Sequence, residues 1–195
     1  MAEPLRRPAG MSFEEFIAFA VETPDDERWE LIDGVPVMAA SPTDLHQVII
    51  GNIITALVTF RRRNRAPWIA LPGVTMRIPA MNHRAPLPDV LVRRAPVIGL
   101  PFSEEALVLF EVLSPRNTPR DREWRLGTYQ NAQGAEHYVV IRQDRPEATR
   151  YDRDADWRPT PVEGIGQALE LPALGTSIAM ADIYEATRFE AETGS

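Results

Sequence analysis

The sequence contains no cysteine and no lysine, only three histidines and no long hydrophobic run. Without cysteine, the chain cannot form a disulfide, an iron–sulfur cluster, a zinc–thiolate site or a cysteine nucleophile. With His46, His83 and His137 as its only imidazoles, we expect no histidine-rich metal site. The apolar runs are far shorter than the roughly 20 residues of a membrane-spanning helix, and the N-terminus lacks the apolar segment of a secretory signal. These absences predict a cytoplasmic protein with no membrane partner.

The absence of lysine means that all 21 basic residues are arginines, against 28 acidic residues and a formal net charge of −7. Arginine keeps its proton in proteins, so no side-chain amine is available for acid–base chemistry. Residues 1–60 and 126–195 are net acidic, whereas residues 61–125 carry 12 arginines and 6 acidic residues. A basic segment of this kind can meet nucleic-acid phosphates. A solvated surface of salt bridges, or a genomic preference for arginine, would give the same pattern.

Apolar periodicity and turn residues predict helices alternating with strands. A capping box at Ser12 and Glu15 should start the first helix, and Asp33-Gly34 should form the turn of a hairpin. In chain order, the predicted elements are a helix (13–21), a hairpin (28–38), a helix (44–64) capped by Ser41 or Thr43, one interrupted strand or a hairpin (68–78), two strands (87–92 and 106–113), a helix ending at Gly134 (119–134), a strand (137–142), short strands (148–152, 157–161 and 168–171) and a helical turn (180–184).

This order of elements predicts an α/β fold in which a central mixed β-sheet is flanked by helices. A length of 195 residues is ordinary for one domain, so we expect a single domain over residues 1–195, with residues 1–11 as a flexible arm. Residues 106–113 are apolar almost throughout, as in a strand that is covered on both faces.

Two carboxylates stand where apolar strands would not normally place them. Asp89 follows Pro88 at the start of one predicted strand, and Glu111 lies inside the next, between Phe110 and Val112. A buried carboxylate must be paired, hydrogen-bonded or bound to metal. If the two strands are neighbours, both side chains point at one spot, where two oxygen donors suit Mg²⁺ or Mn²⁺. The alternative is that Asp89 sits in a turn and Glu111 pairs with an arginine.

Several short motifs occur in an order that resembles the Uma-two family of restriction endonuclease-like proteins, members of the PD-(D/E)XK superfamily. The matching stretches are Trp29-Glu-Leu-Ile-Asp-Gly-Val35, His46-Gln47, Pro88-Asp89-Val90, Phe110-Glu-Val-Leu-Ser-Pro115, Asp121-x₃-Arg125-x₃-Tyr129 and Gly134-Ala-Glu-His-Tyr138. They cover residues 13–141. The resemblance implies a restriction endonuclease-like fold and a metal-dependent endonuclease that cleaves DNA.

The resemblance also implies roles for individual residues. Asp89 corresponds to the acidic residue of the PD element, and Glu111 to that of the (D/E)XK strand, so both are expected to bind Mg²⁺ or Mn²⁺. Glu30 corresponds to an additional acidic residue. His46 would contact metal, water or phosphate, although a histidine that caps a helix is an equal alternative. Arg125 stands where the family carries a catalytic lysine.

Arg125 is the main departure from the family pattern. A guanidinium supplies charge and hydrogen bonds to a phosphate, but it cannot act as a general base. Two functions therefore stay open at this stage. The first is a Mg²⁺-dependent phosphodiester hydrolase in which Asp89 and Glu111 hold the metal and Arg125 neutralises developing charge. The second is a catalytically silent protein of the same fold that binds nucleic acid or a protein partner.

The expected macromolecular partners are DNA and a second copy of the chain. Arg61, Arg62, Arg63 and Arg65 end the long predicted helix and are candidates for contacts with DNA phosphates. The alternative for this cluster is a solvated helix C-terminus, where cations are favourable in any case. A homodimer is expected because cutting two strands with one site per chain requires two chains.

Overall fold

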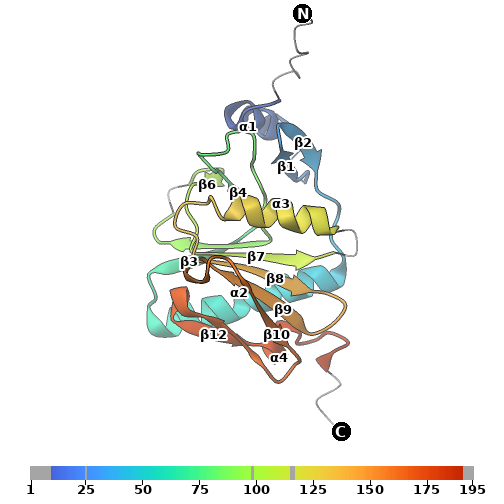
Figure 1. Cartoon of the computed structure of the whole chain (residues 1–195), viewed down its shortest axis with the longest axis vertical. Coiled ribbons are helices and arrows are strands. Elements are labelled where there is room, and N and C mark those ends of the chain that lie inside the picture. The colour runs from blue at the N-terminus through green and yellow to red at the C-terminus, as the bar shows by residue number, and fades with distance from the viewer. Residues whose placement is uncertain (1–9, 25, 98, 115–116, 191–195) are drawn as a thin grey trace, which may run out of the picture.

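The computed structural model describes residues 10–24, 26–97, 99–114 and 117–190 (Figure 1). The arm expected over residues 1–11 lies outside these ranges except for Gly10 and Met11, and the amide of Met11 donates to the carbonyl of Gly34 at 2.8 Å. The elements are α1 (Phe13–Glu22), β1 (Trp29–Ile32), β2 (Val35–Met38), α2 (Asp44–Asn64), β3 (Trp68–Pro72), β4 (Thr75–Met76), β5 (Val90–Arg94), β6 (Phe102–Ser103), β7 (Val108–Leu113), α3 (Pro119–Tyr129), β8 (His137–Arg142), β9 (Glu147–Asp152), β10 (Pro159–Glu163), β11 (Ala168–Leu171), β12 (Thr176–Ala179) and α4 (Met180–Ile183).

Six strands form a mixed central sheet in the order β10-β9-β8-β7-β5-β3. β7 and β8 run parallel, and the other neighbouring pairs are antiparallel. α3 makes the crossover connection that a parallel pair requires. Nearly every residue of β7 and β8 is buried, which agrees with their apolar sequences.

Helices cover both faces of the sheet (Figure 1). On one face, Val108, Phe110 and Val112 of β7 pack in a core with α2, β11, β12 and α4. On the other face, Leu109 packs in a second core with Tyr129 of α3. The alternation along β7 places Glu111 on the same face as Leu109, beneath α3. The predicted fold class, a central mixed sheet flanked by helices, is thus confirmed.

α1 and the β1–β2 hairpin form a smaller unit beside this sheet. Phe13 and Phe16 of α1 pack against Leu31 of β1 and Ala85. Leu31 and Ala85 also exchange backbone hydrogen bonds of 3.0 and 2.9 Å, which fasten the hairpin to the loop that leads into β5. This attachment fixes the position of Glu30, the neighbour of Leu31 in β1.

Most predicted elements are present, and three details were wrong. Residues 68–78 form neither one interrupted strand nor a hairpin, because β4 leaves the central sheet and pairs in parallel with β6. α3 ends at Tyr129 rather than at Gly134, which occupies a later turn with a φ of 74°. Residues 87–89 precede β5 instead of belonging to it. Among the described residues, no helix is long and apolar enough to cross a membrane.

Candidate functional site

The register of the sheet places Asp89 beside Glu111. Asp89 immediately precedes β5, and the first residue of β5, Val90, pairs with Phe110 of β7. The carboxylate of Asp89 then turns toward β7, where its Oδ2 atom accepts a hydrogen bond of 2.7 Å from the amide of Val112. Two carboxylates from adjacent chain segments therefore face the same region at the end of β7.

α3 brings two further polar groups to Glu111. The helix begins at a capping box formed by Thr118 and Asp121. Arg125 and Tyr129 are four residues apart and share the helix face that covers β7. The Nη1 atom of Arg125 donates to Glu111 Oε1 at 2.9 Å, and the Tyr129 hydroxyl donates to the same oxygen at 2.6 Å.

Glu30 completes the cluster from the β1–β2 hairpin. Its Oε1 and Oε2 atoms each accept a hydrogen bond of 2.9 Å from Arg125, from Nη1 and Nη2 respectively. Glu30 Oε1 also accepts one from the amide of Leu87 at 2.8 Å. Arg125 thus bridges Glu30 and Glu111 and joins the hairpin to the central sheet. We name these three residues with Tyr129 the carboxylate–arginine cluster.

His46 approaches Asp89 from the other face of the sheet. It lies in the first turn of α2, where its amide is capped by the Thr43 hydroxyl at 3.2 Å. Its Nε2 atom is 3.4 Å from Asp89 Oδ2. Its Nδ1 atom is buried and has no hydrogen-bond partner among the described residues. Thr43, and not the imidazole of His46, therefore caps the helix, and the imidazole faces Asp89 through Nε2.

A cavity of about 480 Å³ connects these groups. Its wall includes Glu30, His46, Asp89, Glu111 and Arg125, so the structure brings all five candidate catalytic residues to one space. The size suits a small ligand or the backbone of a polymer strand.

Burial raises the pKa of Glu111 to about 8. Arg125 opposes this shift, the charges of Asp89 and Glu30 reinforce it, and the Tyr129 hydroxyl again opposes it. The pKa of Arg125 is raised well above its usual value, because the charges of Glu111 and Glu30 outweigh the opposite effect of burial. Arg125 therefore does not offset the burial of Glu111 together with the charges of Asp89 and Glu30, and a further cation in the cavity would favour the ionised form of Glu111.

Comparison with known proteins agrees with this geometry. The family model Uma2, described as "Putative restriction endonuclease", matches residues 13–181. The chain belongs to the Uma2 family. A solved structure from Anabaena variabilis ATCC 29413, titled a "putative nuclease belonging to DUF820", superimposes with a TM-score of 0.73. The two sequences are 14% identical, and the match covers 89% of this chain and 97% of that one. The expected restriction endonuclease-like fold is thus confirmed. A search of curated proteins found no match.

The residues of this Uma2 site fit a divalent cation by their chemistry. Asp89 and Glu111 supply the carboxylate oxygens that Mg²⁺ and Mn²⁺ prefer, and His46 adds an imidazole nitrogen that Mn²⁺ also accepts. Within the described ranges, however, no three acidic or histidine side chains already converge as a closed cage. Magnesium usually keeps several waters and takes only one or two carboxylates, so an open pair is compatible with it.

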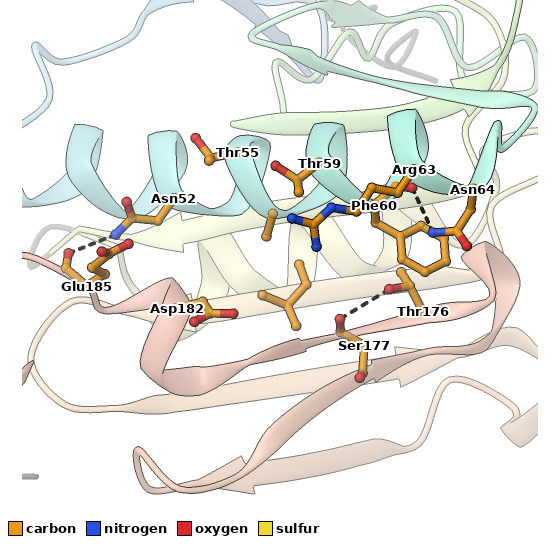
Figure 2. Close-up of a pocket in the computed structure, with 12 residues that line it drawn as sticks. Asn52, Thr55, Thr59, Phe60, Arg63, Asn64, Thr176, Ser177, Asp182 and Glu185 are labelled. Carbon is orange, nitrogen blue, oxygen red and sulfur yellow. Dashed lines mark hydrogen bonds between the residues drawn. The ribbon is translucent and has the colours of Figure 1, made fainter.

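The arginines that end α2 are not part of this Uma2 site. Arg61, Arg62 and Arg63 follow His46 by about four helical turns, at the opposite end of α2. Arg63 lines a second cavity of about 400 Å³, which lies between α2 and the segment that carries β12 and α4 (Figure 2). Thr176, Ser177 and Asp182 form the facing side of that cavity.

Two residues of the site were missed or undervalued in the sequence. Tyr129 is buried in the core, and its hydroxyl also fixes an oxygen of Glu111. Gln143 lines the cavity and joins α2 to β7, because it accepts a hydrogen bond from Thr43 and donates one to the carbonyl of Leu113. The spacing of Tyr129 from Arg125 was a usable signal, whereas nothing in the sequence distinguishes Gln143 from a surface residue.

Proposed function

We propose that this Uma2 protein is a nuclease that uses a divalent metal ion, Mg²⁺ or Mn²⁺, to hydrolyse a phosphodiester bond of DNA in the 480 Å³ cavity. The single observation that carries the proposal is the convergence of Asp89, Glu111 and Glu30, from three separate segments, on one cavity with one bridging arginine. Holding three carboxylates together is unfavourable unless a positive charge compensates them. Family membership supports the same reading, since restriction endonuclease-like nucleases generally use divalent metals.

Asp89 and Glu111 would hold the ion, which supplies positive charge to the phosphate and lowers the pKa of bound water. Asp89 is oriented for this by the amide of Val112, and Glu111 by the hydroxyl of Tyr129. Both carboxylates thus have one oxygen fixed by the protein. Because these oxygens are already held in place, little free energy is needed to organise the metal ligands during the reaction.

Arg125 acts as an internal counter-ion. Its Nη1 atom donates to both Glu30 and Glu111 and its Nη2 atom donates to Glu30, so it holds the two carboxylates in place. This use differs from the direct phosphate contact that the family's lysine position suggested. His46, whose Nε2 atom lies 3.4 Å from Asp89 Oδ2, would contact the ion or a water bound to it.

A catalytically silent protein that binds nucleic acid is the second candidate. The observation that favours it is the saturation of Glu30 by Arg125 and by the amide of Leu87. A guanidinium fixed between two carboxylates can replace a metal ion as their counter-charge. The two candidates then differ in one respect: only the first requires a divalent ion at Asp89.

Plasmid cleavage separates the two candidates. Supercoiled DNA is incubated with the protein in Mg²⁺, in Mn²⁺ and in EDTA, and the products are resolved on a gel. We expect cleavage that depends on metal and is lost in Asp89→Ala. Asp182→Ala, which changes an acidic residue of the second cavity, is the matched control and should cleave normally. Metal binding is measured in parallel by calorimetry, and equal Mn²⁺ affinity in wild type and Asp89→Ala would refute the proposed site.

A further inference from the structure

Arg28 is a cation at the mouth of the cavity that the proposed mechanism does not use. It immediately precedes β1, and it lines the cavity together with Glu30 and Asp89. Its side chain is exposed, and no ion pair or hydrogen bond of its guanidinium occurs within the described part of the chain. Arg125, the other arginine of the wall, is occupied by two carboxylates. Arg28 is therefore the one arginine of the lining with free donors.

The carboxylates nearby do not take up the Arg28 donors. Both oxygens of Glu30 already accept from Arg125, and one of them also accepts from Leu87. Asp89 Oδ2 accepts from Val112 and lies close to His46. Both oxygens of Glu30 and one oxygen of Asp89 thus have other partners, and neither carboxylate pairs with Arg28, which leaves the guanidinium available to an anion from outside.

Gly73 provides the space in which this guanidinium lies. Its φ of 53° falls in the left-handed region that favours glycine. A Cβ atom at this position would overlap Arg28 Nη2 and lie 2.8 Å from Cζ, so the guanidinium rests directly on the glycine backbone. The amide of Gly73 donates to the carbonyl of Asp89 at 3.1 Å. Gly73 thus connects the position of Arg28 to the residue that is proposed to bind metal.

We propose that Arg28 binds a phosphate of the DNA strand that neighbours the scissile phosphate, and that Gly73 positions it for this contact. The inference rests on the proposed function in that the strand must enter the same cavity. A guanidinium presents a planar fork of donors that matches phosphate oxygens. Placed at the mouth, it offsets the negative charge of the carboxylates and admits a polyanion to a site that would otherwise repel it.

The test is DNA binding as a function of salt. A fluorescein-labelled duplex is titrated with wild type, Arg28→Ala, Arg28→Lys, Gly73→Ala and the Arg28→Ala/Gly73→Ala double variant, in EDTA and in Ca²⁺. Losing one phosphate contact should reduce the slope of log affinity against log salt by about 1, and affinity in 0.1 M salt should fall roughly tenfold. Arg158→Ala is the matched control, because Arg158 is an exposed arginine next to β10 and outside the cavity.

Gly73→Ala makes the test specific to position rather than charge. It changes no charge, yet its Cβ displaces the guanidinium, so it should weaken binding in the direction of Arg28→Ala. The double variant should bind no more weakly than Arg28→Ala alone, since the contact is already absent. Arg28→Lys should keep the salt slope and lose part of the affinity. Thermal unfolding of each variant verifies that the fold is retained.

The outcomes separate this inference from the proposed function. An unchanged salt slope in Arg28→Ala, with a wild type that binds and cleaves DNA, overturns the role of Arg28 and leaves the nuclease intact. A reduced slope in a wild type that never cleaves supports the phosphate contact and refutes the nuclease. Independent, additive losses in Arg28→Ala and Gly73→Ala overturn the positioning role of Gly73. A wild type that binds no duplex in either EDTA or Ca²⁺ overturns the inference.

Discussion

At the scale of single residues, the site consists of buried charges that hold one another. Glu111 and Arg125 have side chains that are 8% and 15% exposed, so their ion pair is shielded from water. Two buried charges contribute little net stability together, but removing one leaves the other uncompensated. Substitutions in the carboxylate–arginine cluster should therefore change both the free energy of unfolding and the cleavage activity, and the two effects can be measured separately.

Arg125→Ala should be strongly destabilising. Without the guanidinium, Glu30 and Glu111 stay buried near Asp89 with no counter-charge, which should lower the free energy of unfolding by about 3–5 kcal/mol. Arg125→Lys keeps the charge but loses the paired hydrogen bonds to Glu30, so its loss should be smaller and its metal-dependent cleavage retained. Urea unfolding measures both variants. A loss in Arg125→Ala below about 0.5 kcal/mol, the range of ordinary surface changes, would contradict a buried counter-ion.

Tyr129 and Tyr138 provide an internally controlled comparison. Both are buried tyrosines of the core beneath α3. The Tyr129 hydroxyl donates to Glu111, whereas the Tyr138 hydroxyl has no partner among the described residues. Tyr129→Phe should cost about 1–3 kcal/mol and weaken Mn²⁺ binding, because Glu111 loses a fixed oxygen. Tyr138→Phe should be neutral or stabilising. Equal effects on unfolding and on metal affinity would refute the distinction.

The site residues that could be predicted from the sequence are those marked by an unusual position in a strand or by their spacing on a helix. Glu111 stands out because it is a carboxylate inside an apolar strand. Arg125 and Tyr129 are four residues apart, which places them on one helix face. The contact of Arg28 with Gly73 could not be predicted. It joins residues 45 positions apart through a backbone turn, and neither residue stands out by burial or by periodicity.

At the scale of elements, the sheet register and the crossover position the site. β5 and β7 pair so that Asp89 arrives next to Glu111, and α3 returns along β7 to deliver Arg125. These long elements followed from apolar periodicity. The two-residue strands β4 and β6 did not, because a parallel pair of that length imposes no sequence pattern. The end of α3 was also misjudged, since Gly134 serves a later turn.

His137 couples three elements and should make stability depend on pH. Its Nδ1 atom donates to Asp152 at 2.7 Å, joining β8 to β9, and its Nε2 atom accepts from the amide of Ala173, which precedes β12. Burial lowers the pKa of His137 below its usual value near 6.5, although Asp152 opposes the shift. The native state therefore binds this proton less readily than the unfolded chain. Stability contributed by the neutral form is present above about pH 6.5 and is lost as pH falls below it.

The measurement is urea unfolding at a series of pH values from 7.5 to about 5. Glu111, whose pKa is raised to about 8, has the opposite effect over this range, since the folded state gains stability as that carboxyl takes up its proton. The His137 contribution is therefore read as the difference between wild type and His137→Gln, which should change below pH 6.5 by up to about 1.4 kcal/mol per pH unit.

Two further charges act on the same imidazole: Arg150, which also donates to Asp152, lowers the pKa of His137, and the nearby Glu136 raises it. His137→Gln should flatten the acid slope, whereas His83→Gln, at an exposed histidine, should not. If the loss of stability at acid pH is unchanged in His137→Gln, another group causes it.

At the scale of the whole molecule, folding pairs some arginines of the basic middle segment with acidic residues from elsewhere in the chain. Arg77 pairs with Glu14, Arg84 with Asp33, and Arg125 with Glu30, so acidic partners come from the net acidic N-terminal segment. Within the described residues, the salt-bridge alternative for this segment therefore applies to four of its 12 arginines: Arg77, Arg84, Arg93 and Arg125. The sequence shows the excess of arginine in this segment but not which acidic residues pair with it, because the pairs with Glu14, Asp33 and Glu30 each join residues more than 50 positions apart.

Like Arg65, Arg94 and Arg120 of the basic segment, Arg62 and Arg63 are exposed and form no ion pair with any described residue. They lie about 24 Å from His46 along α2, given a rise of about 1.5 Å per residue. That length corresponds to about seven nucleotides of a duplex, at 3.4 Å per nucleotide in each strand. α2 also covers the face of the sheet opposite to α3. A duplex held at the cavity reaches these arginines only if it bends around the edge of the sheet or if a second chain presents them.

The salt dependence of binding distinguishes a DNA contact from a solvated helix end. If these arginines touch phosphates, Arg62→Ala should reduce the salt slope by about 1, as Arg61→Ala should. Duplexes of 5 base pairs, closed as a hairpin, and of 30 base pairs separate the geometries, because at about 3.4 Å per base pair only the longer one exceeds the roughly 24 Å from His46 to the end of α2. We expect the slope change in Arg62→Ala with the 30-base-pair duplex alone, and that in Arg28→Ala with both. If Arg62→Ala leaves the salt slope unchanged on both duplexes, these arginines are solvated and do not contact DNA. Their presence would then be explained by the favourable position of cations at a helix C-terminus.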